Sequence, residues 1–340
     1  MRKALIILGL SLSAPLMAHQ ESKLATGAIS HGPVGVMGDH LHKTGEWMFS
    51  YRYMRMEMDG NVDGTQSKSS KDITGNMMQP GPYLVAPLKM SMAMHMLGTM
   101  YAPNDELTMM VMVPVLKKDM DHVTRMGQEF STSSSGLGDV SISALLSVFQ
   151  SSDKRHRLHL NLGVSLPTGS IDERDATPAM ANAKMPYAMQ LGSGTFDVLP
   201  GLTYQAYSAQ YNWGTQVLAT LRSGENNEDY RLGNRYEVSG WIARNWSPSL
   251  SSSVRLRHSS WADIHGADAD LNPKMVPTAD TRAQGGERSD LLLGVNYLFT
   301  AGSLKNNRLA LEYGVPVYQE LDGPQMESQS TVTVGWQYAL

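Results

Sequence analysis

Methionine and histidine, whose thioether and imidazole groups bind soft metal ions, are concentrated in one third of this sequence. Of its 24 methionines, 17 lie between Met37 and Met126. The stretch KMSMAMHMLGTMYAP, residues 89–103, has one at every second position from Met90 to Met96. Thioether sulfur suits Cu(I), and imidazole suits copper broadly. The candidate metal ligands are Met48, Met54, Met56, Met58, Met110, Met112, His40, His42 and His95.

Two interpretations of these methionines are open. In the first, they form a path of soft ligands and copper is the bound ion. In the second, methionine fills an irregular interior or meets lipid as an adaptable apolar side chain, and the protein has no cofactor. The second is favoured, because spacing alone does not define a coordination sphere. Neither interpretation makes the protein an enzyme.

One pair of side chains could carry covalent chemistry. His258 and Ser260, in LRHSSW, are two residues apart and share a face if that segment is a strand. Some outer-membrane phospholipases resemble this arrangement. Hydrolysis also needs a group that orients the base, and the sequence places no Asn beside His258. A phospholipase is therefore a remote alternative.

The N-terminal residues and the composition exclude several classes of protein. Residues 1–18, MRKALIILGLSLSAPLMA, combine a basic start, an apolar run and a small residue, which predicts a secretory signal peptide. No later stretch of 18 or more apolar residues predicts a membrane-spanning helix. The net charge of −4 gives no basic surface for nucleic acid, and without cysteine there are no disulfides or thiolate sites.

Strands must position the candidate ligands, because apolar and polar residues alternate. From Gly45, GEWMFSYRYMRMEM places four aromatic residues on one face and Met48, Ser50, Arg52 and three further methionines on the other. Eleven more segments alternate similarly, at about 87–102, 106–118, 138–150, 155–167, 194–207, 210–222, 234–246, 249–261, 289–300, 307–318 and 329–340.

The connections between these segments alternate between long and short. This is typical of outer-membrane barrels, which have long external loops and short periplasmic turns. We therefore predict an all-β protein, a transmembrane antiparallel up-and-down β-barrel of about 12 strands over residues 45–340, in the outer membrane of a Gram-negative bacterium. Residues 19–44 form a periplasmic N-terminal segment and a candidate plug. The expected partners are membrane lipid and, from the last segment STVTVGWQYAL, the outer-membrane assembly machinery.

Alternation also assigns the faces of the barrel. The candidate lumen and selectivity residues are Arg52, Arg157, Arg308 and Glu312. In the third strand Met110 and Met112 are expected to face inward. In the second strand a lipid-facing Lys89 or His95 is costly, so we predict that its methionines face outward and His95 and Ser91 inward.

Several short motifs resemble one known family. Gly136-Leu137-Gly138-Asp139, Leu166-Pro167-Thr168-Gly169-Ser170 and Leu191-Gly192-Ser193-Gly194-Thr195 are similar to segments of the outer-membrane family named for the meta-pathway of phenol degradation. The resemblance implies a channel for a small hydrophobic or aromatic compound. The N-terminal third departs from the general family and looks like a Met-rich subgroup. The alternative is a soft-metal (copper) binding or export-linked outer-membrane protein whose cargo is a metal ion.

Overall fold

The computed structural model describes residues 27–340. The predicted signal peptide and His19 lie outside the described residues. Among the residues that are described, no helix is long and apolar enough to cross a membrane.

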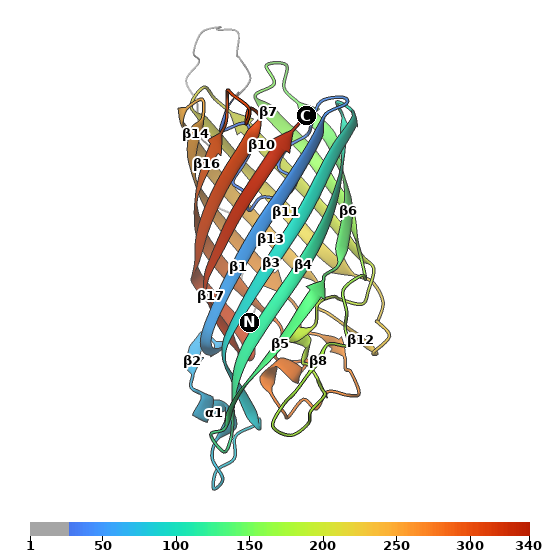
Figure 1. The fold of residues 1–340 in the computed structure, drawn as a ribbon, viewed down its shortest axis with the longest axis vertical. Coiled ribbons are helices and arrows are strands. Elements are labelled where there is room, and N and C mark those ends of the chain that lie inside the picture. The colour runs from blue at the N-terminus through green and yellow to red at the C-terminus, as the bar shows by residue number, and fades with distance from the viewer. Residues whose placement is uncertain (1–26) are drawn as a thin grey trace, which may run out of the picture.

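One antiparallel sheet closes on itself to form a barrel (Figure 1). Its strands follow one another around the ring in chain order, and the last strand, β17, pairs back with the first, β1. The ring is made of β1 (Trp47–Gly64), β3 (Val85–Asn104), β4 (Leu107–Thr124), β6 (Val140–Gln150), β7 (His156–Leu166), β10 (Asp197–Tyr207), β11 (Tyr211–Arg222), β13 (Arg235–Ser247), β14 (Leu250–Trp261), β16 (Gly286–Leu298) and β17 (Asn307–Ala339).

The long strand β17 contributes two segments to the wall. Residues 308–321 pair with β16, and residues 321–339 pair with β1. The chain reverses at Gly323, whose φ of 79° is costly for residues other than glycine. The wall therefore has twelve antiparallel segments. The predicted all-β barrel is confirmed, although the expected loop between residues 318 and 329 is a continuation of both strands and a tight turn.

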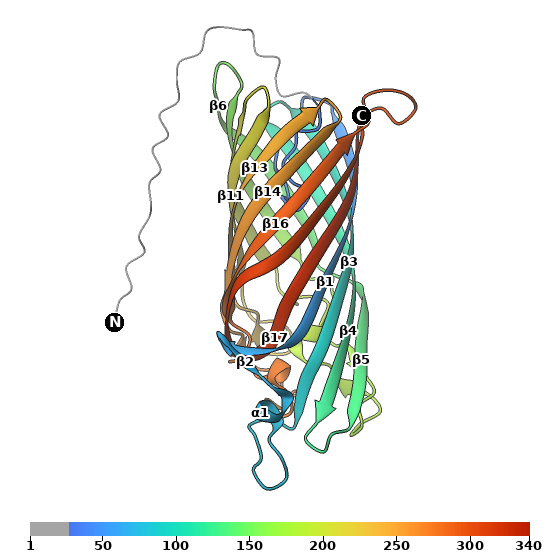
Figure 2. The same ribbon diagram turned by 90° about the vertical axis from the view of Figure 1, so that its left-hand side faces the viewer.

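The two ends of the barrel differ in their connections (Figure 2). Short turns such as residues 105–106, 208–210 and 248–249 lie at one end together with the C-terminus, which we call the short-turn end. The opposite, long-loop end carries the remaining elements, which are β2 (Gln66–Lys68), α1 (Ser70–Thr74), β5 (Glu129–Leu137), β8 (Arg174–Asp175), β9 (Ala183–Lys184), η1 (Tyr187–Met189), β12 (Tyr230–Arg231), β15 (His265–Gly266) and η2 (Pro277–Ala279).

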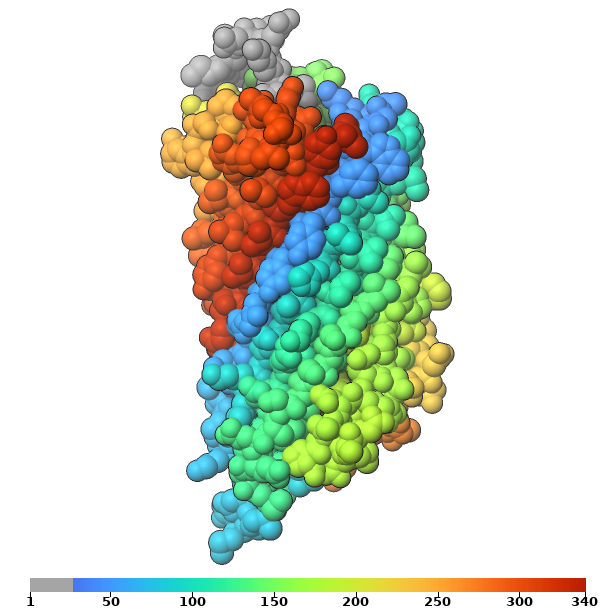
Figure 3. All heavy atoms as spheres, viewed as in Figure 1, coloured from blue at the N-terminus to red at the C-terminus, as the bar shows by residue number. Residues whose placement is uncertain are grey.

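Side chains alternate between the two faces of the wall, as the sequence predicted. Asn296 and Glu312 face inward and are each 1% exposed, whereas Leu293 and Leu311 face outward and are 54% and 49% exposed. Outward apolar groups suit a hydrocarbon surround, and inward polar groups suit a lumen. Figure 3 shows the strands as slanted bands, with β17 lying directly against β1 where the ring closes.

The prediction for the second barrel strand, β3, is wrong. Met96 lies opposite the inward Arg52, and His95 lies opposite the outward Tyr53. Residues directly opposite in an antiparallel pair share a face, so the methionines of β3 face inward and His95 outward. The cost of placing an imidazole outside is reduced by a hydrogen bond between Tyr51 Oη and His95 Nδ1 (2.7 Å). Ser91, opposite Glu57, also lies on the outward face.

Replacing Leu162 by Arg is expected to lower the free energy of unfolding by about 2–4 kcal/mol, the cost of a guanidinium near the bilayer midplane. Leu162 lies in the middle of β7 and is 44% exposed on the outward face. Urea unfolding in phospholipid vesicles, followed by tryptophan fluorescence, measures the change. Met78→Arg, in a loop and 94% exposed, is the control. Equal effects of the two substitutions would contradict a lipid-facing Leu162.

Candidate functional site

The candidate site is the lumen together with the segment of residues 27–46, which enters it from the short-turn end. Backbone groups of this segment are held by side chains from strands all around the ring. The Asn212 amide donates to the Ile29 carbonyl (2.9 Å), His159 Nε2 to Gly38 (2.9 Å), Arg308 to Gly32 (2.9 Å), and Thr108 Oγ1 accepts from the His42 N–H (3.0 Å). These residues belong to β11, β7, β17 and β4, so the segment crosses the interior of the barrel.

A buried ion pair supports the middle of this segment. Arg255 donates two hydrogen bonds to the Glu312 carboxylate (2.6 and 3.2 Å), and the two side chains are 2% and 1% exposed. A Cβ at Gly35 would collide with the guanidinium and the carboxylate of this pair. Gly35 therefore lets the backbone pass directly over the ion pair, and a larger side chain there would push the segment away.

The four predicted lumen residues all face inward, but each has a partner. Arg308 donates to Gln337 (3.2 Å) as well as to Gly32. Arg52 donates to Met37 Sδ (2.9 Å), and the Arg157 guanidinium lies over the Tyr207 ring at 5.4 Å. With Glu312 bound to Arg255, these charges hold the wall and the N-terminal segment together. Their role in selectivity stays a prediction.

Three histidines and an aspartate gather within the N-terminal segment. The His31 and His40 rings are 4.0 Å apart, and the His40 and His42 rings 4.7 Å apart. Asp39 Oδ1 lies 2.8 Å from His40 Nδ1, and Asp39 Oδ2 accepts from the Gly32 N–H (2.6 Å). Burial lowers the pKa of His42 to about 4, and burial also lowers the pKa of His31 well below its usual value. Both imidazoles are therefore neutral near pH 7.

Sequence reasoning predicted His40 and His42 but did not single out His31 as a ligand. His31 is nine residues from His40, and the chain between them must fold back to bring the two rings together. The repeated glycines in HGPVGVMGDH, with Gly38 at a φ of 59°, are the signal for such a turn. The predicted ligand His95 faces outward and lies apart from this group.

Methionines line one side of the lumen along three neighbouring strands, β1, β3 and β4. The outer rows are Met48–Met100–Met110, nearest the short-turn end, and Met58–Met90–Met120, nearest the long-loop end. Between them, Met54 lies opposite Met94 and Met56 opposite Met92. Met112 faces inward as predicted and packs against the first row. We call this surface, made of Met48, Met54, Met56, Met58, Met90, Met92, Met94, Met96, Met100, Met110, Met112 and Met120, the methionine wall.

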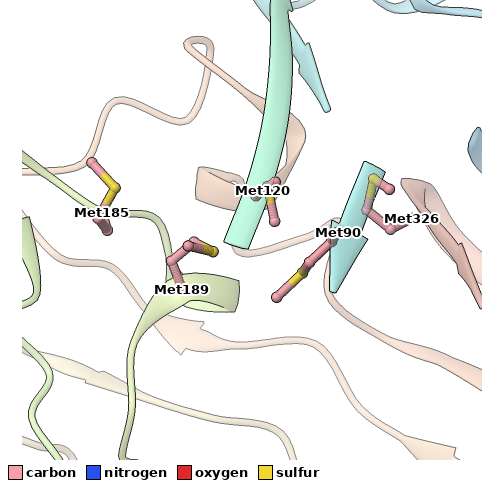
Figure 4. Close-up of a cluster of buried hydrophobic side chains, with 5 residues drawn as sticks. All are labelled: Met90, Met120, Met185, Met189 and Met326. Atoms are coloured by element: carbon pink, nitrogen blue, oxygen red, sulfur yellow. The ribbon is translucent and has the colours of Figure 1, made fainter. Parts of the chain in front are cut away.

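At the long-loop end the methionine wall borders a cavity of about 160 Å³. Met56, Met58, Met90, Met120 and Met326 line it, together with Trp261 and residues of the β14–β16 loop. Figure 4 shows Met185 and Met189, from the loop between β7 and β10, beside Met90, Met120 and Met326. A second cavity, of about 10 Å³, lies near the short-turn end between Asp39, Arg52 and the wall. It has room for about one water molecule.

The structure gives His258 a different partner from the expected one. His258 Nδ1 lies 3.0 Å from Ser289 Oγ, and Nε2 lies 4.0 Å from Glu287 Oε2. His258 and Ser260 lie opposite Val238 and Tyr236, which are exposed on the outward face. The two side chains therefore share the outward face, as expected, but His258 bonds to Ser289 instead of Ser260, and the remote phospholipase alternative stays a prediction.

Comparisons with known proteins place this geometry in context. A family model described as "Putative MetA-pathway of phenol degradation" matches residues 78–257. An outer membrane channel from Pseudomonas putida F1 superposes with a TM-score of 0.60 at 16% identity, over 90% of this chain and 99% of that one. A Pseudomonas aeruginosa FadL homologue gives a TM-score of 0.39 at 10% identity, over 86% and 89% of the two chains. No curated protein matches the sequence.

Replacing Gly35 by Leu is expected to raise single-channel conductance several-fold, because the new side chain displaces the N-terminal segment from the Arg255–Glu312 pair. Planar-bilayer recordings at fixed salt concentration measure it. Gly240→Leu is the matched control, since Gly240 faces outward and a Cβ there has only one atom within 4 Å, at 3.8 Å. Unchanged conductance in Gly35→Leu would show that the segment does not limit passage.

Proposed function

We propose a transport function for this chain, which belongs to the family described as the putative MetA-pathway of phenol degradation. Its channel-like barrel lies in the outer membrane of a Gram-negative bacterium, with lipid around it and a small molecule as cargo. Short turns face the periplasm in such barrels, and long loops face outside. The cargo that we propose is a small apolar compound, of the size of a single aromatic ring, which enters from the long-loop end.

The cavity at the long-loop end carries this proposal. Its volume of about 160 Å³ is close to the roughly 150 Å³ of an engineered cavity that binds benzene; methionines supply most of its apolar lining, and Arg288, Gln319 and Ser328 add polar groups. Methionine sulfur makes favourable contacts with aromatic rings, and its flexible side chain adapts to guests of different shape. Trp261 adds an aromatic surface, and Gln284 and Gln325 supply polar groups for a single hydroxyl.

Passage from this cavity requires the N-terminal segment to move or loosen, since residues 27–46 occupy the lumen beneath it. We assign that segment the role of a plug at the periplasmic end. The proposed function involves no covalent step, so we expect no enzymatic activity and no resident cofactor for transport. The assembly machinery stays a predicted partner.

Filling the cavity tests the assignment of the cargo. Met120→Trp, which places an indole in the cavity, is expected to weaken the binding of 4-fluorophenol at least tenfold. Fluorine NMR of the ligand titrated with the detergent-solubilised barrel measures the affinity. Met109→Trp is the matched control, because Met109 lies on the same strand but faces outward and is 47% exposed. Equal affinities of the two variants, or no binding to wild type, would contradict the proposal.

The continuous methionine wall favours a second candidate function, contact with Cu(I). Directly opposed thioethers from three strands, such as Met48, Met100 and Met110, could pass a soft cation between neighbouring sulfur atoms. Contact with Cu(I) would require no rearrangement of the strands. The soft ligands would lie on one side of the lumen only. It differs from the first in what the methionines bind and not in the direction of passage.

Oxidation of the methionines distinguishes the two candidates. Under the second, Ag(I), a soft monovalent stand-in for Cu(I) that peroxide does not oxidise, is expected to slow sulfoxide formation by peroxide at Met54, Met56, Met110 and Met112 several-fold, because a metal-bound sulfur is a poorer nucleophile. Peptide mass spectrometry with and without Ag(I) measures each rate. Met78 and Met126, 94% and 78% exposed in loops, should oxidise equally fast in both samples. Equal rates at the wall with and without Ag(I) would remove the candidate.

A further inference from the structure

The N-terminal segment contains an arrangement of ligand atoms that neither proposed cargo requires. One nitrogen or oxygen atom from each of His31, Asp39 and His40 lies within 4.8 Å of the others. Asp39 and His40 are buried, at 5% and 8% exposed. His31 Nδ1, His40 Nε2 and His42 Nε2 have no hydrogen-bond partner among the described residues. Buried ring nitrogens are normally satisfied, so three in one group point to a missing ligand.

We propose that His31, Asp39 and His40 bind a borderline transition-metal cation, Cu(II) or Zn(II), within the lumenal segment. Two imidazoles and one carboxylate are a common set of three protein ligands for such ions. Metal–ligand bonds of about 2.0–2.2 Å would require the three side chains to close in from their present separation by small rotations. Hard cations such as Mg²⁺ prefer sites made of oxygen alone, so this set disfavours them.

Asp39 has a defined part in this site. Its Oδ2 is held by the Gly32 N–H at 2.6 Å, and its Oδ1 lies beside His40 Nδ1 at 2.8 Å. A carboxylate that binds one ring nitrogen directs the other nitrogen of the same ring toward a metal. Without metal, Asp39 orients His40 through Nδ1 and leaves Nε2 free; on metal binding Oδ1 would leave Nδ1 and become the third ligand, while the Gly32 N–H keeps Oδ2 in place.

The neighbouring arginine side chains do not occupy the proposed metal site. Arg308 donates to the Gly32 carbonyl and to Gln337, and Arg52 donates to Met37 Sδ. Neither guanidinium forms an ion pair with Asp39 among the described residues, although both are cationic neighbours that weaken the binding of any cation. Strong bonds from neutral nitrogen ligands are therefore needed to offset this repulsion, which is a further reason to expect copper or zinc instead of an ion held by charge alone.

Metal binding at this site would fasten the segment inside the barrel. His31 and His40 are nine residues apart, so one ion bound to both closes a loop that contains Gly35, the residue seated over the Arg255–Glu312 pair. Further ligands lie next to this loop: the His42 ring is 4.7 Å from that of His40, and Met48, Met100 and Met110 line the small cavity together with Asp39. The site is independent of the transported solute, because it requires only residues of the segment itself.

Metal content of the untagged mature protein tests the site directly. The detergent-solubilised barrel is dialysed against Cu(II), Zn(II) or Mg(II) alone and then analysed by inductively coupled plasma mass spectrometry. We expect about one equivalent of Cu(II) or Zn(II), no retained Mg(II), and at least tenfold weaker binding in His31→Gln and His40→Gln. His265→Gln, in the short strand β15, is a control that should bind as wild type does. In His19→Gln, which removes the histidine at the predicted start of the mature chain and its own affinity for Cu(II), the one equivalent at His31, Asp39 and His40 should remain.

Electron paramagnetic resonance of Cu(II) in the His19→Gln variant provides a second measurement, because an N-terminal histidine alone would supply two nitrogen ligands. Splitting from at least two nitrogen atoms is expected. Absence of bound metal in wild type, full binding in both His31→Gln and His40→Gln, or loss of binding in His19→Gln alone would each overturn the proposal. Heat-modifiable gel mobility confirms that each variant is folded. None of these measurements involves a solute, so they can fail while the proposed transport function stands.

Discussion

The structure depends on one constraint, which is that no strand edge can be left unpaired in hydrocarbon. An unpaired backbone group there costs several kcal/mol, so an open sheet of this length could not span a membrane. Pairing of β17 with β1 from Met48 to Gly64 removes the last edges. Closure then determines which residues face the lumen. Each strand turns alternate residues inward, and the residues opposite them on the neighbouring strand face inward too.

Strand pairing, and not the chemistry of single residues, decides which face a side chain occupies. The alternating pattern was sufficient to predict the barrel, most strand boundaries and the inward position of Glu312, since each of these follows from one segment or from the order of connections. It failed for β3, because pairing with β1 turns the more apolar methionine face inward and the face that carries Lys89 and His95 outward. The expected cost of a lipid-facing imidazole led to the wrong face for His95. Tyr51, on the adjacent strand, supplies a hydrogen bond that reduces this cost and that the sequence of one strand does not reveal.

Contacts between distant parts of the chain could not be predicted at all. The proximity of His31 to His40 depends on how a glycine-rich segment folds inside the barrel. The strands that surround this segment come after it in the sequence. Ser289 replaces Ser260 as the partner of His258 because β14 and β16 are neighbours, a fact carried by topology and not by spacing. The cavity likewise depends on Met326, which is brought beside Met90 by closure of the barrel.

The segment inside the lumen and the wall of the barrel are held by different kinds of contact. This difference makes a barrel with a filled lumen compatible with transport. The wall is a continuous ladder of backbone hydrogen bonds, which hydrocarbon protects from water. Residues 27–46 are held mainly by separate side-chain contacts, such as those from Asn212, His159 and Arg308. Each contributes only about 0.5–1.5 kcal/mol, and more for a charged donor, because water in an opened lumen can replace it. Displacing the segment would therefore break these side-chain contacts but no strand pairing, and an ion bound to two of its histidines would add to the weaker of the two sets of contacts.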